Sequence, residues 1–152
     1  MKPSNHCKTI LLVEDNLADE ELTLMAFARS GIKNPIVVAR DGQEALDYLF
    51  CEGSYQKRNA TELPQVILLD LKLPKLNGLE VLKRIRENAL TKHVPIVTLT
   101  NSTEGQDLHD AYALGTNAYV QKPVDFSKFS NAVNTLGLFW LCLNECPDGC
   151  PA

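Results

Sequence analysis

Four stretches of the sequence place a charged or hydroxyl side chain at the end of a run of mostly apolar residues. These side chains are the acidic pair Glu14-Asp15, then Asp70, Thr100 and Lys122. Carboxylates that meet in one place repel one another unless a cation lies between them, and oxygen ligands with room for water suit Mg²⁺ or Mn²⁺. A lysine in the same cluster would neutralise more charge and offer donors to an anion. Together these residue types predict a divalent-ion site beside an aspartate that can accept a phosphoryl group.

The apolar runs before these side chains predict β-strands that are covered on both faces, because they do not alternate with polar residues. We expect strands at 9–14, 36–39, 66–70, 95–100 and 118–121. Helices are expected between and after them, over 17–28, from a capping box at Asp41 and Glu44 to Leu49, from Asn77 to Ile85, from a cap at Ser102 or Thr103 to Leu114, and from near Asp125 onward. Strict alternation of this kind predicts a doubly wound α/β fold, (βα)5, in which the strand ends meet at one edge.

Length and composition agree with one domain. The chain has 152 residues, of which 45% are hydrophobic, and a formal net charge of −4. Its acidic balance gives no electrostatic footprint for nucleic acid or an anionic membrane, and no segment reaches the roughly 18 apolar residues of a membrane span. We therefore expect a cytoplasmic protein with an extension over 1–8, a domain over 9–143 and a tail over 144–152.

The ordered motifs resemble the receiver domain of two-component response regulators. The resemblance rests on Glu14-Asp15, on Asp70 followed by Leu-Lys-Leu-Pro and then Gly78, on Thr100, and on Lys122-Pro123. It implies a flavodoxin-like sheet with strand order 2-1-3-4-5. The opening Leu-Leu-Val-Glu-Asp, the long loop before Pro64 and the Phe-Trp pair near the end are similar to single-domain regulators that work with cyanobacterial phytochromes.

The resemblance also implies a role for each matching residue. Asp70 would accept the phosphoryl group from a histidine kinase, here of the phytochrome type. Asp15, Asp70 and the backbone carbonyl of Lys72 would bind Mg²⁺ or Mn²⁺, with Glu14 acting directly or through water. The phosphoryl-binding and switch residues would be Lys122, Thr100, the backbone of Asn101 and Tyr119, and the peptide bond at Pro123 would be cis. Asn101 departs from the small residue that most receivers carry there, and this bears on access of the hydrolytic water.

The end of the chain predicts a contact with a second protein. The segment 136–143 is apolar almost all round, whereas a helix on the surface of a monomer should present a polar face. We expect a homodimer through the last helix, with Leu136, Phe139, Trp140 and Leu143 in the interface, and a downstream partner whose identity the sequence does not give. Cys142, Cys146 and Cys150 are four residues apart, but Pro147 and Gly149 favour loose thiols over a metal site.

Two other functions remain open at this point. One is an aspartate-nucleophile phosphohydrolase, although such enzymes usually carry a second aspartate where this chain has Lys72. The other is a pseudo-receiver that binds partners without ever taking a phosphoryl group. Retention of the whole motif set favours the phosphorylated receiver over both.

Overall fold

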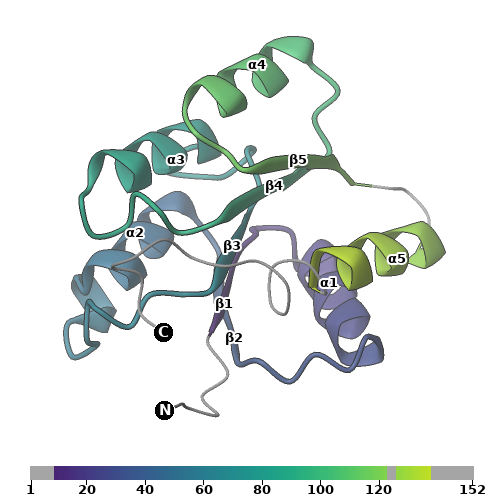
Figure 1. The fold of residues 1–152 in the computed structure, drawn as a ribbon, viewed down its shortest axis with the longest axis horizontal. Coiled ribbons are helices and arrows are strands. Elements are labelled where there is room, and N and C mark those ends of the chain that lie inside the picture. The colour runs from purple at the N-terminus through teal and green to yellow at the C-terminus, as the bar shows by residue number, and fades with distance from the viewer. Residues whose placement is uncertain (1–8, 123–125, 138–152) are drawn as a thin grey trace.

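The centre of the computed structural model is a five-stranded parallel sheet in the order β2-β1-β3-β4-β5 (Figure 1). The structure describes residues 9–122 and 126–137. Its strands are β1 (Ile10–Val13), β2 (Ile36–Ala39), β3 (Val66–Leu69), β4 (Ile96–Thr100) and β5 (Ala118–Gln121). The predicted fold class and strand order are confirmed.

In the described part of the chain, five α-helices and one 3-10 helix connect and cover the strands. They are α1 (Leu17–Arg29), α2 (Gly42–Phe50), the 3-10 helix η1 (Gly53–Tyr55), α3 (Gly78–Glu87), α4 (Gly105–Ala113) and α5 (Phe126–Gly137). Three α-helices begin at a side chain that accepts the N–H of the residue three positions later, namely Asn16, Asp41 and Asn77. Such caps satisfy N–H groups that the helix itself leaves unpaired. Within the described residues, no helix has the length and apolarity needed to cross a membrane.

The start of α4 differs from the prediction. Its N-cap is Glu104, which makes no capping hydrogen bond with its side chain, and neither Ser102 nor Thr103 takes that position. The Ser102 hydroxyl is engaged elsewhere, because it donates to Asp107 at 2.5 Å. The capping box of α2 is also only half formed, since Glu44 accepts from the N–H of Arg40 and not from that of Asp41.

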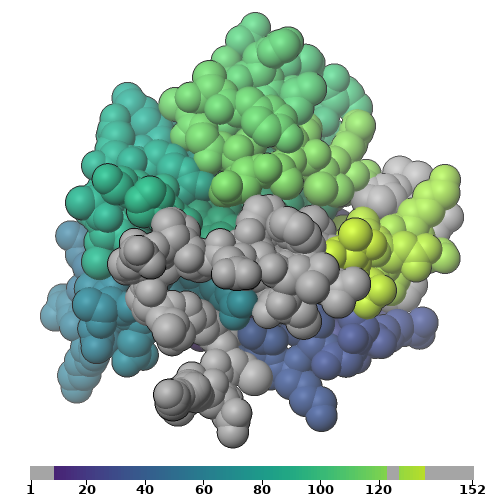
Figure 2. Space-filling model, in the orientation of Figure 1, coloured from purple at the N-terminus to yellow at the C-terminus, as the bar shows by residue number. Residues whose placement is uncertain are grey.

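Each face of the sheet has its own hydrophobic core. Side chains that alternate along the strands point to opposite faces, so Leu11 and Ile67 pack with α2, α3 and α4, while Leu12 and Leu68 pack with α1 and α5. All four of these strand side chains are buried. Helices α1 and α5 contact each other, and α3 and α4 form the upper part of the surface in Figure 2. The sheet is therefore held rigidly between two helical layers.

A half-buried guanidinium fastens the edge of the sheet where β4 and β5 begin. Arg86 of α3 donates to the backbone carbonyls of Lys92, Val94 and Gly115 at 2.7–2.9 Å and to the side-chain oxygen of Asn117 at 2.7 Å. Gly115 has φ = 102°, and a Cβ there would lie 3.0–3.2 Å from three atoms of the Arg86 side chain. This cluster, Arg86 with its four acceptors, is called the Arg86 clamp below.

Some predicted features lie outside the described residues. These are Pro123, with its predicted cis bond, the cysteines at 142, 146 and 150, and the interface candidates Phe139, Trp140 and Leu143. Leu136 lies within α5, but its side chain is outside the description. The predicted dimer interface and the proposed boundaries of the extension and tail stay predictions.

Candidate functional site

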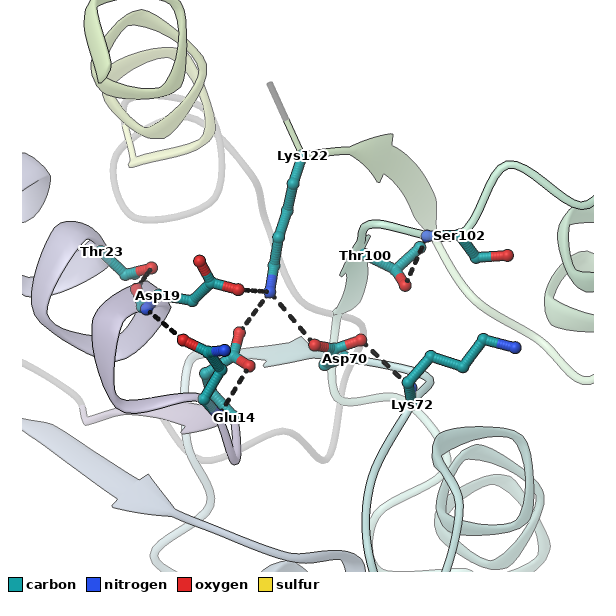
Figure 3. A network of polar contacts seen from close by, with 9 residues as sticks. Glu14, Asp19, Thr23, Asp70, Lys72, Thr100, Ser102 and Lys122 are labelled. Atoms are coloured by element: carbon teal, nitrogen blue, oxygen red, sulfur yellow. Dashed lines mark hydrogen bonds and ion pairs between the residues drawn. The ribbon is translucent and has the colours of Figure 1, made fainter. Parts of the chain in front are cut away.

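The carboxyl ends of four strands bring the predicted side chains to one edge of the sheet (Figure 3). Glu14 and Asp15 follow β1, Asp70 follows β3, Thr100 ends β4, and Lys122 comes directly after β5. Parallel strands that run in register place their ends side by side, which is why residues far apart in the sequence meet here. Backbone hydrogen bonds hold the strand ends in place, from Asp70 N to Val13 O at 3.1 Å and from Lys122 N to Thr100 O at 2.7 Å.

The ammonium group of Lys122 lies at the centre of this edge. Its Nζ donates to Glu14 Oε1 at 2.5 Å, to Asp19 Oδ2 at 2.9 Å and to Asp70 Oδ2 at 3.1 Å. The Lys122 side chain is 3% exposed, as is that of Glu14, whereas the Asp19 side chain is 24% exposed. An ammonium has three hydrogens to donate, so each is matched by one of these carboxylates.

Burial and pairing act in opposite directions on these charges. Burial raises the pKa of Glu14 to about 7, although its hydrogen bond from Lys122 lowers that pKa. Burial alone would lower the pKa of Lys122, but its pairing with Glu14, Asp70 and Asp19 outweighs burial and raises the pKa above its ordinary value. Lys122 therefore keeps its proton, and the carboxylates around it still carry more negative charge than it neutralises.

Three of the predicted acidic residues converge closely enough to hold a metal ion. One carboxylate oxygen from each of Glu14, Asp15 and Asp70 lies within 4.8 Å of the others. Asp15 is exposed, while Glu14 and Asp70 are buried, so the cluster is open to solvent on one side. An oxygen-only donor set that leaves room for water fits a hard divalent ion such as Mg²⁺ or Mn²⁺.

The loop after β3 presents Asp70 in one orientation. The N–H of Lys72 donates to Asp70 Oδ1 at 3.1 Å, while the other carboxylate oxygen faces Lys122. The loop is packed tightly against the start of α3, where a Cβ on Gly78 would lie 2.3 Å from the Asp70 carbonyl oxygen and 2.6 Å from Leu71 Cα. Only glycine allows the helix to approach the loop this closely.

Thr100 lies at the same edge but belongs to a different hydrogen-bond network. Its hydroxyl accepts from the N–H of Ser102 at 3.2 Å, and it makes no hydrogen bond to Asp70 or Lys122 within the described part of the chain. The Ser102 hydroxyl donates to Asp107, whose carboxylate also pairs with Lys72 Nζ at 3.4 Å. This network links the loop after Asp70 to the first turn of α4.

Tyr119 packs inward against the core on the α2, α3 and α4 side of the sheet. Its hydroxyl is buried and has no hydrogen-bond partner of ordinary geometry within the described residues. Burial raises its pKa, and the nearby Ser102 hydroxyl lowers it by less. A buried hydroxyl without a partner is unfavourable and therefore uncommon. Asn101, by contrast, is exposed at the rim of the site.

The structure thus brings Glu14, Asp15, Asp70 and Lys122 together as expected and keeps Thr100 nearby. The sequence interpretation missed the Asp19 contact with Lys122 and the bridge from Ser102 to Asp107 and Lys72. Asp19 carries a signal that could have been used, because it lies in the first turn of the helix that begins directly after the strand end with Glu14 and Asp15. Asp107 and Lys72 lie 35 positions apart, and no local pattern connects them.

Comparison with known proteins agrees with this geometry. The family described as "Response regulator receiver domain" matches residues 10–134. Response regulator Rcp1 of Synechocystis is 38% identical over 91% of this chain and 92% of its own length. A crystal structure of its Mn²⁺-bound form has a TM-score of 0.84, at 36% identity, and covers 92% of this chain and 99% of that one.

Two further solved structures are similar. The phosphorylated cyanobacterial phytochrome response regulator RcpA has a TM-score of 0.85 and 39% identity, covering 93% of this chain and 99% of its own. The bacteriophytochrome response regulator AtBRR has a TM-score of 0.72 and 54% identity, covering 91% of this chain and 98% of its own.

Proposed function

This chain belongs to the receiver-domain family of response regulators, and from that premise we propose that Asp70 takes its phosphoryl group from the phosphohistidine of a histidine kinase. The single observation that carries the assignment to Asp70 is the orientation of its carboxylate. One oxygen is held by the N–H of Lys72 and the other faces the buried ammonium of Lys122. No other aspartate in the described residues combines burial, a strand end and a lysine partner.

The proposed chemistry is transfer of one phosphoryl group. An oxygen of Asp70 attacks phosphorus, the bond from phosphorus to the histidine nitrogen breaks, and that nitrogen keeps the electron pair. In deactivation, a water oxygen attacks phosphorus, the aspartate leaves as a carboxylate with the electron pair of the broken bond, and inorganic phosphate and a proton pass to solvent. Lys122 donates to the negative oxygens that accumulate charge in both steps.

Glu14, Asp15 and Asp70 would hold a divalent ion, together with the backbone carbonyl of Lys72. The ion, when bound, supplies positive charge that offsets the charge of the phosphoryl group. The observed convergence of three carboxylate oxygens supports this set, and the Mn²⁺-bound form of Rcp1 shows that a relative binds such an ion. Within the chain itself, Glu14 is oriented by the N–H of Asn16 at 3.2 Å and by Lys122.

Thr100, the backbone of Asn101 and Tyr119 would report the phosphoryl group to the surface. A new anion on Asp70 attracts hydroxyl and N–H donors, so Thr100 would exchange its contact with Ser102 for one with the phosphoryl oxygen. The Tyr119 hydroxyl has no hydrogen-bond partner of ordinary geometry among the described residues. This supports such a rearrangement, because the side chain can change its rotamer at little cost in hydrogen bonds. The signal then passes to a downstream protein through altered contacts.

The kinase that fits best is of the phytochrome type. Support comes from the phytochrome response regulator RcpA and the bacteriophytochrome response regulator AtBRR, which match this chain over nearly its whole length. The homodimer through the last helix rests on the sequence pattern alone and stays a prediction.

Mass spectrometry of the intact protein tests the central proposal. Incubation with Mg²⁺ and acetyl phosphate should add one phosphoryl group that survives acid and is removed by base. Asp70→Asn should abolish the adduct, whereas Asp110→Asn, a change of the same kind on α4, should leave it intact. A pseudo-receiver would give no adduct in the wild type, and a phosphohydrolase would turn over unrelated phosphate esters.

A further inference from the structure

Asp19 is the third carboxylate on Lys122 and the one that stands apart from the metal-binding group. Its Oδ2 accepts from Lys122 Nζ at 2.9 Å, slightly closer than the 3.1 Å of Asp70. The group of convergent oxygens contains Glu14, Asp15 and Asp70 but not Asp19. Asp19 therefore contacts the lysine without sharing in the predicted metal site.

The backbone of Asp19 is fixed while its carboxylate reaches solvent. The Asp19 N–H donates to the side chain of Asn16 at 2.9 Å, and its carbonyl accepts from the Thr23 hydroxyl at 2.8 Å. Both bonds are local to α1 and its N-cap, and they fix the backbone of its first turn. Because its side chain is 24% exposed, water can replace Lys122 as the partner of this carboxylate at low cost.

Asp19 contacts the Lys122 ammonium on the side away from the one where the proposed function needs it. Asp19 approaches the ammonium from the α1 side, and Asp70 approaches it from the opposite side (Figure 3). All three hydrogens of the ammonium are in use. A phosphoryl group on Asp70 inherits the share of Asp70 but offers more acceptor oxygens, so it gains further donation from Lys122 only when Glu14 or Asp19 gives up its share.

We propose that Asp19 is a positioning residue that competes with the phosphoryl group for Lys122 and so limits how far the protein is phosphorylated. Of the two carboxylates that compete with the phosphoryl group, Glu14 is buried and Asp19 reaches solvent, so Asp19 is the acceptor that yields. The charge of Asp19 also lies close to the new anion, because one oxygen of Asp19 and one oxygen of Asp70 are both within 3.1 Å of Lys122 Nζ. The proposal rests on the proposed function of Asp70.

Asp19→Asn keeps the shape and the acceptor oxygen but removes the charge. We expect the acetyl phosphate concentration that gives half-maximal phosphorylation, at fixed Mg²⁺, to fall about fivefold, as for the loss of one partly exposed like charge near an anion. Asp19→Glu keeps the charge, so its half-maximal acetyl phosphate concentration should stay within about twofold of the wild-type value. The matched control is Glu21→Gln, which removes one exposed charge from the far side of the same helix and should have no effect.

A second readout reports on Lys122 directly and needs no phosphorylation. The ¹³Cε and ¹Hε resonances of Lys122 should move in Asp19→Asn and stay in place in Glu21→Gln, whereas a purely structural role in α1 would leave them unchanged in both. An unchanged or increased half-maximal concentration in Asp19→Asn, with normal phosphorylation of the wild type, would overturn the proposal. Failure of the wild type to form any adduct would instead overturn the proposed function, and this inference with it.

Discussion

Two cations, Lys122 and Arg86, lie partly or wholly inside this protein near opposite ends of the strands, and their surroundings differ in charge. Lys122 contacts three carboxylates, from Glu14, Asp19 and Asp70. Arg86 contacts three backbone carbonyls and one side-chain amide, with no carboxylate among its described partners. The Lys122 cluster carries excess negative charge, whereas the Arg86 clamp carries only the charge of its own guanidinium.

The difference separates a site that responds to charge from one that maintains the fold. Adding a phosphoryl group or a divalent ion changes the balance around Lys122, because its carboxylates can exchange partners. The acceptors of Arg86 are neutral and belong mostly to the backbone, and the planar guanidinium matches them with fixed donor directions. We therefore expect changes at Lys122 to alter phosphorylation and changes at Arg86 to alter stability.

The largest effect is expected for Lys122→Met at the charged cluster. Loss of a preorganised donor to the phosphoryl oxygens should slow adduct formation from acetyl phosphate by about a hundredfold. Time-resolved intact mass measures the rate, and Lys83→Met on the exposed side of α3 is the control. A rate within a few-fold of the wild type would show that Lys122 serves only to pair with its neighbours.

Arg86→Ala should have its main effect on folding. Removing the guanidinium leaves several acceptors at the clamp without partners, which should lower the free energy of unfolding by about 3 kcal/mol. Arg84→Ala on the same helix removes only a surface pair with Glu80 and should cost less than about 1 kcal/mol. Urea unfolding measures both variants.

Under conditions where Arg86→Ala is folded, its phosphorylation rate should match that of the wild type. A large loss of phosphorylation with normal stability would break the contrast between the two cations. Arg86→Lys keeps the charge but not the fork of donors, so it should recover only part of the stability.

The sequence predicted the charged cluster far better than the clamp, and the reason is physical. Strand ends are marked locally by apolar runs, and parallel topology then brings Glu14, Asp70 and Lys122 together without further information. The acceptors of Arg86 are mostly backbone carbonyls, which every residue has, so no side-chain pattern reveals them. Asp19 and Asp107 were missed because a surface-like acid near a helix start has an ordinary explanation as a partner of the helix dipole.

The predicted N-cap of α4, Ser102 or Thr103, was wrong because the helix begins later, after Glu104. Ser102 has the side chain of a good N-cap, but it lies two residues before the N-cap, where its hydroxyl donates to Asp107 and accepts from the N–H of Glu104. Residue propensity names a capping side chain but does not fix the residue at which the helix begins. The same contact joins α4 to Lys72, so the misassigned residue lies in the network that adjoins Thr100.

The last predicted effect is a pH dependence that should arise at the charged cluster and not at the clamp. Burial raises the pKa of Glu14 from 4.5 to about 7 in the folded protein. Between these values the folded protein keeps a proton that the unfolded chain has lost, so the stability contributed by Glu14 is full below pH 4.5 and declines as the pH rises towards 7. Urea unfolding in the presence of a chelator should show this decline, and Glu14→Gln should remove it.

Arg86 keeps its proton throughout that range and its acceptors do not titrate, so Arg86→Ala should lower the whole stability curve without changing its slope relative to the wild type. Glu21→Gln provides the matched loss of an exposed acid and should keep the slope of the wild type. Mg²⁺ should reduce the decline, because metal binding favours the ionised carboxylates and offsets their repulsion. The contrary outcome is a free energy of unfolding that, in chelator, rises with pH in the wild type relative to Glu14→Gln. Glu14 would then be ionised in the folded protein, and Lys122 would simply form ion pairs with its carboxylates.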